Sequence, residues 1–346
     1  MLTQPSYRSL RNPTVAIVGA TGAVGSELIR VLEDREFPLA GLKLLASARS
    51  AGTTLSFRGQ PLAVGELSAD SFAGVDLALF AADAATALTY VPHARAAGAL
   101  VIDNSSAYRL DEDCPLVLPE VNLETLTWHR GVIANPNCTA IITCMAVAPL
   151  QRRFGLRRLQ LATYQAASGA GAPAMAELVA STEAYLKGEP FTPKALKHPY
   201  AFNLFSHDSE VDVATGYNGE EQKVMAEARR LLGAANLPIG ITSVRVPVLR
   251  AHAIAISAEL DAPVAPAAVR ECLEESPGVR VIDDRAANHF PMPVEAENQG
   301  DVLVGRIRRD LGDPSGRSVA LFVAGDQLLK GAALNAVQIA EALLVA

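Results

Sequence analysis

Short apolar runs alternate with stretches of helical periodicity along the first part of the chain. Within residues 26–35 the apolar side chains Leu28, Val31 and Leu32 recur at the spacing that places them on one helix face. Strands that alternate with helices are typical of a parallel sheet with right-handed crossovers. The strands predicted here are 14–18, 42–45, 75–81 and 100–102, and a further helical stretch is 92–97.

The pattern changes after about residue 150, where the strand-like runs become longer. The alternation in 252–260 favours an antiparallel or mixed sheet with one covered face. Residues 187–210 are rich in Pro, His and Lys and predict a long excursion, whereas 326–346 predict an apolar-faced helix with Gly331 near its start. The strands predicted in this part are 158–166, 241–248, 252–260, 302–308 and 318–324.

Length and composition agree with an α/β protein of two domains. The chain has 346 residues, more than one ordinary core accommodates, and half of them are hydrophobic. The net charge is −7 and no basic block is present, which argues against nucleic acid and anionic membranes as partners. No apolar run approaches the roughly 20 residues that span a bilayer. The first dozen residues are polar and predict a short frayed tail rather than a signal peptide.

Four cysteines are present, and none forms a CxxC pair or has zinc-ligand spacing with histidine. Four thiols in a chain of this length do not make a disulfide framework. We therefore expect a reduced, cytoplasmic protein with no metal.

The segment GATGAVG at 19–25 follows a predicted strand and precedes a predicted helix. Its glycines allow a tight turn and a close approach of the backbone to a pyrophosphate, which then lies on the helix N-terminus. This context favours a dinucleotide over a glycine-rich turn without a ligand. The predicted binding residues of the loop are Gly19, Thr21, Gly22, Ala23, Val24 and Gly25.

The end of the second strand bears on which dinucleotide binds. An NAD-binding unit usually has an acidic residue there, which accepts from the ribose 2′-hydroxyl. Here the segment carries Ser47, Arg49 and Ser50 and no acid. Arginine and serine can hold a 2′-phosphate, so the sequence favours NADP, although Arg49 as a solvated loop residue remains the alternative.

Cys138 lies in the segment ANPNCTA, directly before an apolar stretch with the character of a buried helix. Pro136 and Asn137 are good helix-start residues, so Cys138 falls in or near the first turn. There the free N–H groups and the positive end of the helix dipole favour thiolate over thiol. A small core residue is the alternative for any lone cysteine, and Cys144, deeper in the same helix, is our candidate for that role.

Several motifs together resemble the aspartate-semialdehyde dehydrogenase family. They occur in one order from about residue 14 to 344. The motifs are GATGAVG, SARSAG at 47–52, DNSSAYR at 103–109, LPEVN at 118–122, PNC, YQAASGAG at 164–171, EEQK at 220–223, RVPVLRAH at 245–252, VGRIRRD, and LLKGAALNAVQIAE.

The resemblance implies a role for particular residues. Cys138 matches the nucleophile that forms a thioester or thiohemiacetal, and His252 matches the general acid/base. Gln165 matches the glutamine that orients the reacting groups. Without the resemblance, His252 is better interpreted as a satisfied histidine at a strand edge. The family's fold, similar to that of glyceraldehyde-3-phosphate dehydrogenase, implies a homodimer built on the second domain.

Substrate and cofactor residues are implied in the same way. Arg245 matches the arginine that binds the substrate carboxylate, and Glu220 and Lys223 match residues that meet the substrate ammonium and phosphate. A solvated ion pair is the alternative for Glu220 and Lys223, which are three residues apart. The remaining matches are Arg109 and Asn137 for phosphate, and Gly169 and Asn335 near the nicotinamide.

The implied reaction is the NADP-dependent reductive dephosphorylation of β-aspartyl phosphate to aspartate semialdehyde, in lysine, threonine and methionine biosynthesis. N-Acetyl-γ-glutamyl-phosphate reductase and a catalytically silent homologue are the alternatives, and PNC with EEQK argues against the first. Ala253 and the stretch Ala81–Asp83 depart from the family pattern. The predicted domains are 1–136 plus 327–346 for NADP binding, and 137–326 for catalysis and dimerisation.

Overall fold

The computed structural model describes residues 10–344. It divides into two compact units, of which one runs to Asn137 and resumes at Ala332, and the other is Cys138–Gly331. The chain returns to the first unit five residues later than predicted. The side chains of Asp326 and Gln327 bond to Arg250 and Ser168, which belong to the second unit. Residues 1–9 of the predicted tail lie outside the described residues, whereas Leu10 is buried and bridges Leu344.

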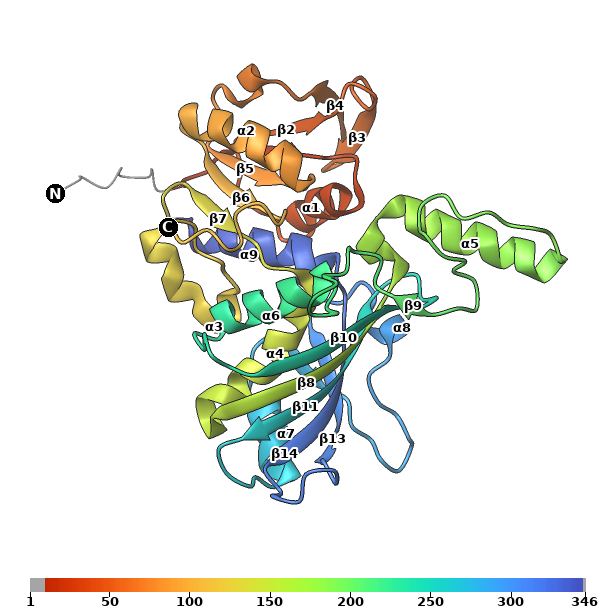
Figure 1. The fold of residues 1–346 in the computed structure, drawn as a ribbon. Coiled ribbons are helices and arrows are strands. Elements are labelled where there is room, and N and C mark those ends of the chain that lie inside the picture. Colours follow the sequence, from red (N-terminus) through yellow and green to blue (C-terminus); the bar gives the residue numbers. More distant parts are fainter. Residues whose placement is uncertain (1–9, 345–346) are drawn as a thin grey trace. The chain divides into compact units, whose positions relative to one another are not determined.

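The first unit is a Rossmann-type sheet with the strand order β3-β4-β2-β1-β5-β6-β7 (Figure 1). All neighbouring strands are parallel except β3 and β4, which form a hairpin. The strands are β1 (Thr14–Val18), β2 (Gly41–Ala46), β3 (Thr54–Phe57), β4 (Gln60–Glu66), β5 (Leu77–Phe80), β6 (Leu100–Asp103) and β7 (Val132–Ala134). The helices are α1 (Ala23–Asp34), α2 (Ala84–Ala96), α3 (Pro119–Asn122) and α9 (Leu334–Ala342), with 3₁₀ turns at Ala69–Phe72 and Leu123–Trp128.

The glycine loop between β1 and α1 is shaped by backbone contacts. Gly19 has a φ of 83° and donates its N–H to the carbonyl of Leu45 at the end of β2. A Cβ at Gly25 would lie well inside contact distance of the Gly19 carbonyl oxygen and of the Ala20 backbone. The first turn of α1 therefore packs directly on the loop, and only glycine permits this approach.

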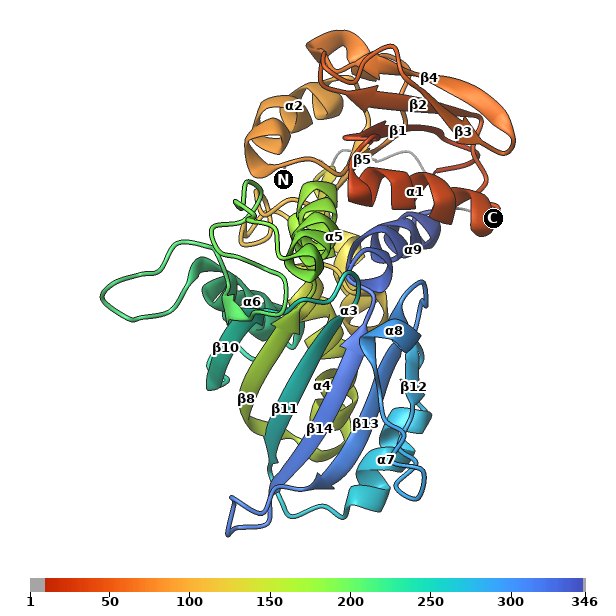
Figure 2. The same ribbon diagram turned by 90° about the vertical axis from the view of Figure 1, so that its right-hand side faces the viewer.

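The second unit is a mixed sheet with the order β12-β13-β14-β11-β8-β10-β9. In β8 the odd-numbered residues 159, 161, 163 and 165 are buried, whereas most even-numbered residues are exposed. Figure 2 shows the strands in front and α4 behind them, so helices cover one face, as the alternation predicted. The strands are β8 (Leu156–Gln165), β9 (Phe205–Ser206), β10 (Ile239–Arg245), β11 (His252–Leu260), β12 (Val279–Val281), β13 (Val302–Arg309) and β14 (Ser318–Gly325). The helices are α4 (Cys138–Phe154), α5 (Ala172–Lys187), α6 (Gly219–Leu231), α7 (Pro266–Glu274) and α8 (Pro293–Ala296), with a 3₁₀ turn at Ala167–Ala170 and a π-helical turn at Leu329–Ala333.

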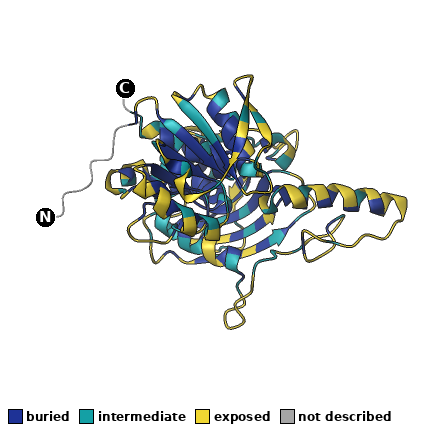
Figure 3. Cartoon of the chain, turned by 90° about the horizontal axis from the view of Figure 1, so that it is seen from above, coloured by how far each residue is buried: buried dark blue, intermediate teal, exposed yellow. Residues whose placement is uncertain are grey.

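The predicted excursion at 187–210 begins at the end of α5, a helix whose outer half is largely exposed (Figure 3). The buried carboxylate of Glu177 on α5 accepts three backbone N–H groups, from Lys194, Ala195 and Leu196. The Tyr200 hydroxyl donates to the carbonyl of Val246 at 2.7 Å. The excursion is therefore tied to its unit by buried and partly buried hydrogen bonds and is not a loose loop.

The part of the chain that the structure describes, residues 10–344, has neither a membrane-spanning helix nor a cluster of metal ligands. No helix there is long and apolar enough to cross a membrane. No group of three or more His, Cys, Asp or Glu residues there has the arrangement of a metal site, so the expected lack of a metal remains a prediction.

Substituting Gly25 by alanine tests the packing of the loop. The added methyl group has no room against the Gly19 backbone, so we expect Gly25→Ala to lower the free energy of unfolding by about 1–3 kcal/mol. Gly22→Ala is the matched control, because a Cβ there comes no closer than 3.3 Å to the Gly19 carbonyl oxygen. Chemical denaturation of both variants measures this, and equal stabilities would contradict the packing argument.

Candidate active site

Three strands of the second unit bring polar side chains to one end of the sheet. β8 and β10 are parallel, and their last residues, Gln165 and Arg245, are register partners. β11 is antiparallel to β8 and begins with His252, so this residue lies at the same end. All three side chains are buried and lie on the face that the helices cover.

Cys138 is the first residue of α4, as the helix-start residues before it predicted. Its thiol is partly buried and lies 4.0 Å from the hydroxyl of the buried Thr139. A Cβ at Gly331 would lie 2.9 Å from the Cβ of Cys138, so the π-helical turn passes directly beside the cysteine.

The amide group of Gln165 connects the start of α4 to the start of α6. Its Nε2 donates to Thr139 Oγ1 and to Glu220 Oε1, both at 3.0 Å. Glu220 lies in the first turn of α6, which Asn218 caps through its side chain. Glu220 is thus held in a buried hydrogen-bond network, which argues against the alternative of a solvated ion pair. Lys223 is exposed one turn further along α6.

The ring of His252 has two different nitrogen environments. Nδ1 accepts the backbone N–H of Ala166 at 3.0 Å, so in the neutral ring the proton is on Nε2. Nε2 is buried and has no hydrogen-bond partner among the residues that the structure describes, and the same holds for Gln165 Oε1. Burial, with the nearby Arg245 and His207, holds the pKa of His252 well below its usual value. His252 is therefore a neutral imidazole with an unused Nε2–H.

Gly169 lies between His252 and Arg245. A Cβ at this position would meet His252 Nε2 at 3.0 Å and Arg245 Nη1 at 3.0 Å. The glycine therefore leaves open the space into which both groups point. The neighbouring Ser168 is buried and accepts a hydrogen bond from Gln327, whose Oε1 in turn accepts the N–H of Ala251.

In the first unit, the predicted cofactor residues share one edge of the sheet. Ser47, Arg49 and Ser50 form the turn after β2, whose Leu45 carbonyl accepts from the glycine loop. Thr21 is exposed and Ala23 and Val24 are half-buried at the start of α1. Asp83, in a stretch that departs from the family pattern, caps α2 by accepting the N–H of Thr86.

The other predicted residues of the first unit are buried. Arg109 donates to the carbonyls of Asn135 and Asn104 at 2.9 and 2.7 Å. Asn335 donates to the Val117 carbonyl and to Asn135 Oδ1, so its side chain serves the packing of α9. Asn137 is buried at the end of the unit's first segment.

Comparison with known proteins agrees with this arrangement. Residues 14–129 match the model of the semialdehyde dehydrogenase NAD binding domain, and 147–330 match that of the semialdehyde dehydrogenase dimerisation domain. An aspartate-semialdehyde dehydrogenase from Synechocystis is 47% identical over 330 residues, which are 95% of this chain and 97% of that protein. One from Bacillus subtilis is 43% identical, with 95% and 96% covered.

The chain belongs to the aspartate-semialdehyde dehydrogenase family.

Solved structures agree on the fold. The crystal structure of aspartate semialdehyde dehydrogenase II from Vibrio cholerae, complexed with ASA, has a TM-score of 0.91 and 38% identity, with 96% of this chain and 98% of that chain covered. The structure from Candida albicans with NADP has a TM-score of 0.74 at 23% identity, which supports the fold alone. The predicted resemblance and the predicted two-domain α/β fold of the aspartate-semialdehyde dehydrogenase family are thus confirmed.

Two polar residues of this family member were not singled out by the sequence. His207 and Asp208 follow β9, which pairs with Val244 and Arg245 at the end of β10. Asp208 Oδ1 accepts from Arg245 Nε at 3.2 Å. No local pattern pointed to them, because they reach the site through a strand pairing between segments 37 residues apart.

The protonation state of His252 can be tested directly. Since its pKa is lowered, we expect the ring to remain neutral with the proton on Nε2 as the pH falls to 6.5, where a free histidine is half protonated. Nitrogen-15 NMR of histidine-labelled protein distinguishes the two neutral tautomers and the charged ring, and His252→Asn assigns the signal. Protonation near pH 6.5, or a proton on Nδ1 of the neutral ring, would contradict the geometry.

Proposed function

We propose that this protein is an NADP-dependent aspartate-semialdehyde dehydrogenase that acts through a thioester on Cys138. The reaction is the reductive dephosphorylation of β-aspartyl phosphate to aspartate semialdehyde, a step towards lysine, threonine and methionine. The observation that carries the proposal is the convergence of Gln165, Arg245 and His252 at one end of the second unit's sheet, with Gln165 bonded to the residue next to Cys138. Relatives at 43–47% identity bear the same enzyme name.

Cys138 supplies the nucleophile. At the first residue of α4 its sulfur lies near N–H groups that have no intrahelical carbonyl partner, which favours the thiolate. The sulfur forms a bond to the acyl carbon of the substrate, the carbon–oxygen bond to phosphate breaks, and phosphate leaves. The side chain of Gln165 orients the thiolate and the acyl group, and its own position is fixed by the bonds of Nε2 to Thr139 and Glu220.

His252 acts on the substrate oxygen. Its Nε2–H is buried and unused, so it donates a hydrogen bond to the oxygen that becomes negative when the thioester carbon turns tetrahedral. The carbon–sulfur bond then breaks and the thiolate of Cys138 leaves, which releases the aldehyde. The family resemblance matches this residue to a general acid/base. The geometry favours a ring that donates a hydrogen bond from Nε2 over one that accepts a proton.

The charged groups of the site fit an amino-acid substrate. Arg245 binds the α-carboxylate, since its guanidinium is buried and its N–H fork matches a carboxylate. Glu220 meets the ammonium group, and Lys223 meets the phosphate. Arg109 and Asn137, which the resemblance matches to phosphate ligands, are proposed for that role.

The first unit fits a dinucleotide. At Gly19 and Gly25 a side chain would collide with neighbouring backbone atoms. The tight loop that these glycines allow suits the approach of a pyrophosphate to the start of α1. Ser47, Arg49 and Ser50 would hold the 2′-phosphate of NADP. When bound, NADPH would supply the hydride for the reduction, and Gly169 and Asn335 are the residues proposed near its nicotinamide.

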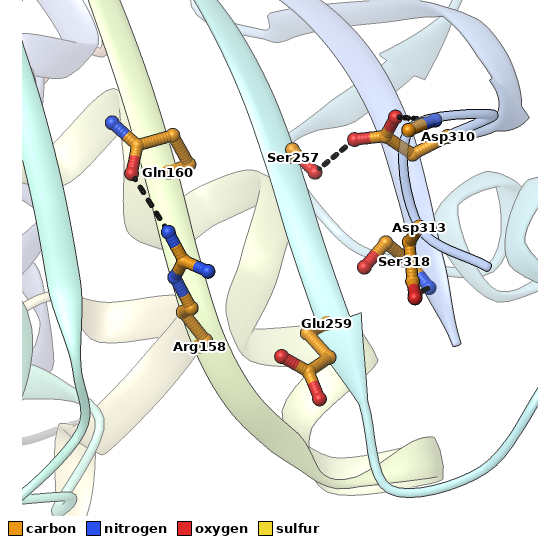
Figure 4. A pocket seen from close by; sticks show the side chains of 8 residues that line it. Arg158, Gln160, Ser257, Glu259, Asp310, Asp313 and Ser318 are labelled. Carbon is orange, nitrogen blue, oxygen red and sulfur yellow. Dashed lines mark hydrogen bonds between the residues drawn. The ribbon is translucent and has the colours of Figure 1, made fainter. Parts of the chain in front are cut away.

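We also propose that the enzyme is a cytoplasmic homodimer that pairs through the open face of the second sheet. Within the described residues, no helix covers this face, which carries Tyr164 and Phe322 with ring centroids 6.3 Å apart. The rest of this face is polar, and Figure 4 shows Arg158 bonded to Gln160 along β8 and Ser257 of β11 bonded to Asp310, which follows β13. The matched dimerisation-domain model spans this sheet. A reducing compartment suits the thiolate of Cys138, which is a free cysteine.

The activity can be measured in the reverse direction with aspartate semialdehyde, phosphate and NADP⁺, as the absorbance of NADPH. We expect activity in the wild type and a loss of roughly three orders of magnitude or more in Cys138→Ala, because the nucleophile is removed. Cys144→Ala is the matched control, since Cys144 is fully buried in α4 and burial raises the pKa of its thiol. An inactive wild type, an active Cys138→Ala, or a preference for N-acetylglutamate semialdehyde would refute the proposal.

The cofactor preference rests on Arg49. We expect Arg49→Ala to raise the KM for NADP⁺ by about tenfold and to leave that for NAD⁺ nearly unchanged, because only NADP carries the 2′-phosphate. Arg58→Ala is the control for loss of an arginine, because Arg58 donates to the Phe37 carbonyl in the same unit. Equal catalytic efficiency of the wild type with both cofactors would argue against NADP.

A further inference from the structure

The excursion at 187–210 returns to the sheet beside Arg245. β9 pairs with the end of β10, and the N–H of His207 donates to the carbonyl of Ser243 at 2.9 Å. This backbone bond extends the pairing one residue beyond β9, so the position of Asp208 relative to Arg245 is fixed by the strand register. Tyr200, bonded to the carbonyl of Val246, holds the preceding part of the excursion against the same segment.

The guanidinium of Arg245 has two partners in the structure. Nε donates to Asp208 Oδ1 at 3.2 Å, and Nη1 donates to the carbonyl of Ala166 at 3.3 Å. Only 5% of the Arg245 side chain is exposed, against 24% of Asp208. Bonds from two nitrogens of a planar group define its plane, and they leave Nη2 and the second N–H of Nη1 to face a ligand.

Asp208 is charged under working conditions. Burial raises the pKa of its carboxyl, but Arg245, His207 and a hydrogen bond to the backbone outweigh burial, so the pKa is lowered overall. Charged groups of both signs surround His207 as well: Glu220 raises the pKa of its ring, whereas Arg245 and Lys223 lower it. The pair of Asp208 and Arg245 is therefore a partly buried ion pair with a charge-assisted hydrogen bond.

We propose that Asp208 is a positioning residue that orients Arg245 for the carboxylate of the substrate. The inference rests on the proposed function, in which Arg245 binds that carboxylate. A long arginine side chain has many rotamers, and ordering it only when the substrate arrives costs affinity. Asp208 orders the guanidinium before binding, and it does so through Nε, away from the nitrogens that the substrate needs.

The opposite role for Asp208 is a competitor. A carboxylate that occupied the substrate's place on Arg245 would have to be displaced, and its removal would then lower the KM. The single contact at Nε argues against this role, because a carboxylate that fills an arginine fork engages two nitrogens in parallel. The two roles therefore predict opposite changes in the KM for aspartate semialdehyde.

The test compares Asp208→Ala and Asp208→Asn with the wild type in the reverse assay. We expect Asp208→Ala to raise the KM for aspartate semialdehyde by roughly tenfold, and Asp208→Asn by less, since asparagine keeps an acceptor oxygen. The KM for phosphate and kcat should change little, because Asp208 acts through Arg245, which binds the carboxylate of the substrate and not the phosphate. Asp212→Asn is the matched control, since Asp212 is an exposed aspartate of the same region whose carboxylate accepts from its near neighbours Ala214 and Thr215.

A double-mutant cycle with Arg245→Lys decides whether Asp208 acts through Arg245. Lysine keeps the charge but has no Nε–H at that place, so the effect of Asp208→Ala should disappear in the Arg245→Lys background. A lower or unchanged KM in Asp208→Ala, an equal rise in the KM for phosphate, or full additivity in the cycle would overturn the inference. If Arg245→Lys itself leaves the KM for aspartate semialdehyde unchanged, the proposed role of Arg245 fails instead.

Discussion

The register of β8 with its two neighbours is the constraint on which the site depends. A parallel pairing places Gln165 beside Arg245, and an antiparallel pairing starts β11 at the same end with His252. Because side chains alternate along a strand, a slip of one residue in either pairing would move a site residue to the open face of the sheet. The apolar residues between them, such as Leu161, Ile241 and Ile256, are buried under the helices and make such a slip costly. The hydrophobic core thus determines the chemistry at the end of the strands.

Two glycines let the other parts of the site approach these strands. Gly169 has no side chain and so leaves space beside His252 and Arg245. Gly331 lets the π-helical turn pack against Cys138. π-Helical turns inside helices occur frequently at functional sites, where a regular helix would not bring the required backbone close enough. The acid Asp326 holds the start of this turn, since it accepts the N–H groups of Leu328 and Leu329 as well as Arg250. A buried ion pair and a packed glycine therefore hold the π-helical turn beside Cys138.

Most strands of both sheets were predictable because a buried strand leaves a local pattern of apolar residues in the sequence. β1, β5 and β6 are buried along their length and occur as short apolar runs, and β11 alternates as a half-covered strand does. The hairpin of β3 and β4 escaped prediction because it lies at the edge of the sheet, where most of its residues are exposed.

The site likewise contains features that local sequence predicts and features that it does not. The position of Cys138 at a helix start follows from Pro136 and Asn137, which are its neighbours in sequence. The contact of Asp208 with Arg245 and that of Gln165 with Glu220 join segments 37 and 55 residues apart, and no local pattern encodes them. The position of Asn335 near the nicotinamide stays a prediction from the resemblance, and its amide is bonded to Val117 and Asn135 inside the first unit.

The neutral state of His252 agrees with the charge changes that the proposed reaction requires. Thiolate attack on an acyl carbon and the later expulsion of that thiolate both pass through an oxyanion, and neither step needs a proton on the substrate oxygen. A hydrogen-bond donor that keeps its proton is therefore sufficient, and the N–H of Ala166 on Nδ1 prevents the ring from taking up a second proton without losing that bond. A charged imidazolium would also raise the cost of burial next to Arg245, which already lowers the pKa of His252. Burial, the backbone bond and the neighbouring arginine thus all favour the form of the histidine that stabilises the oxyanion.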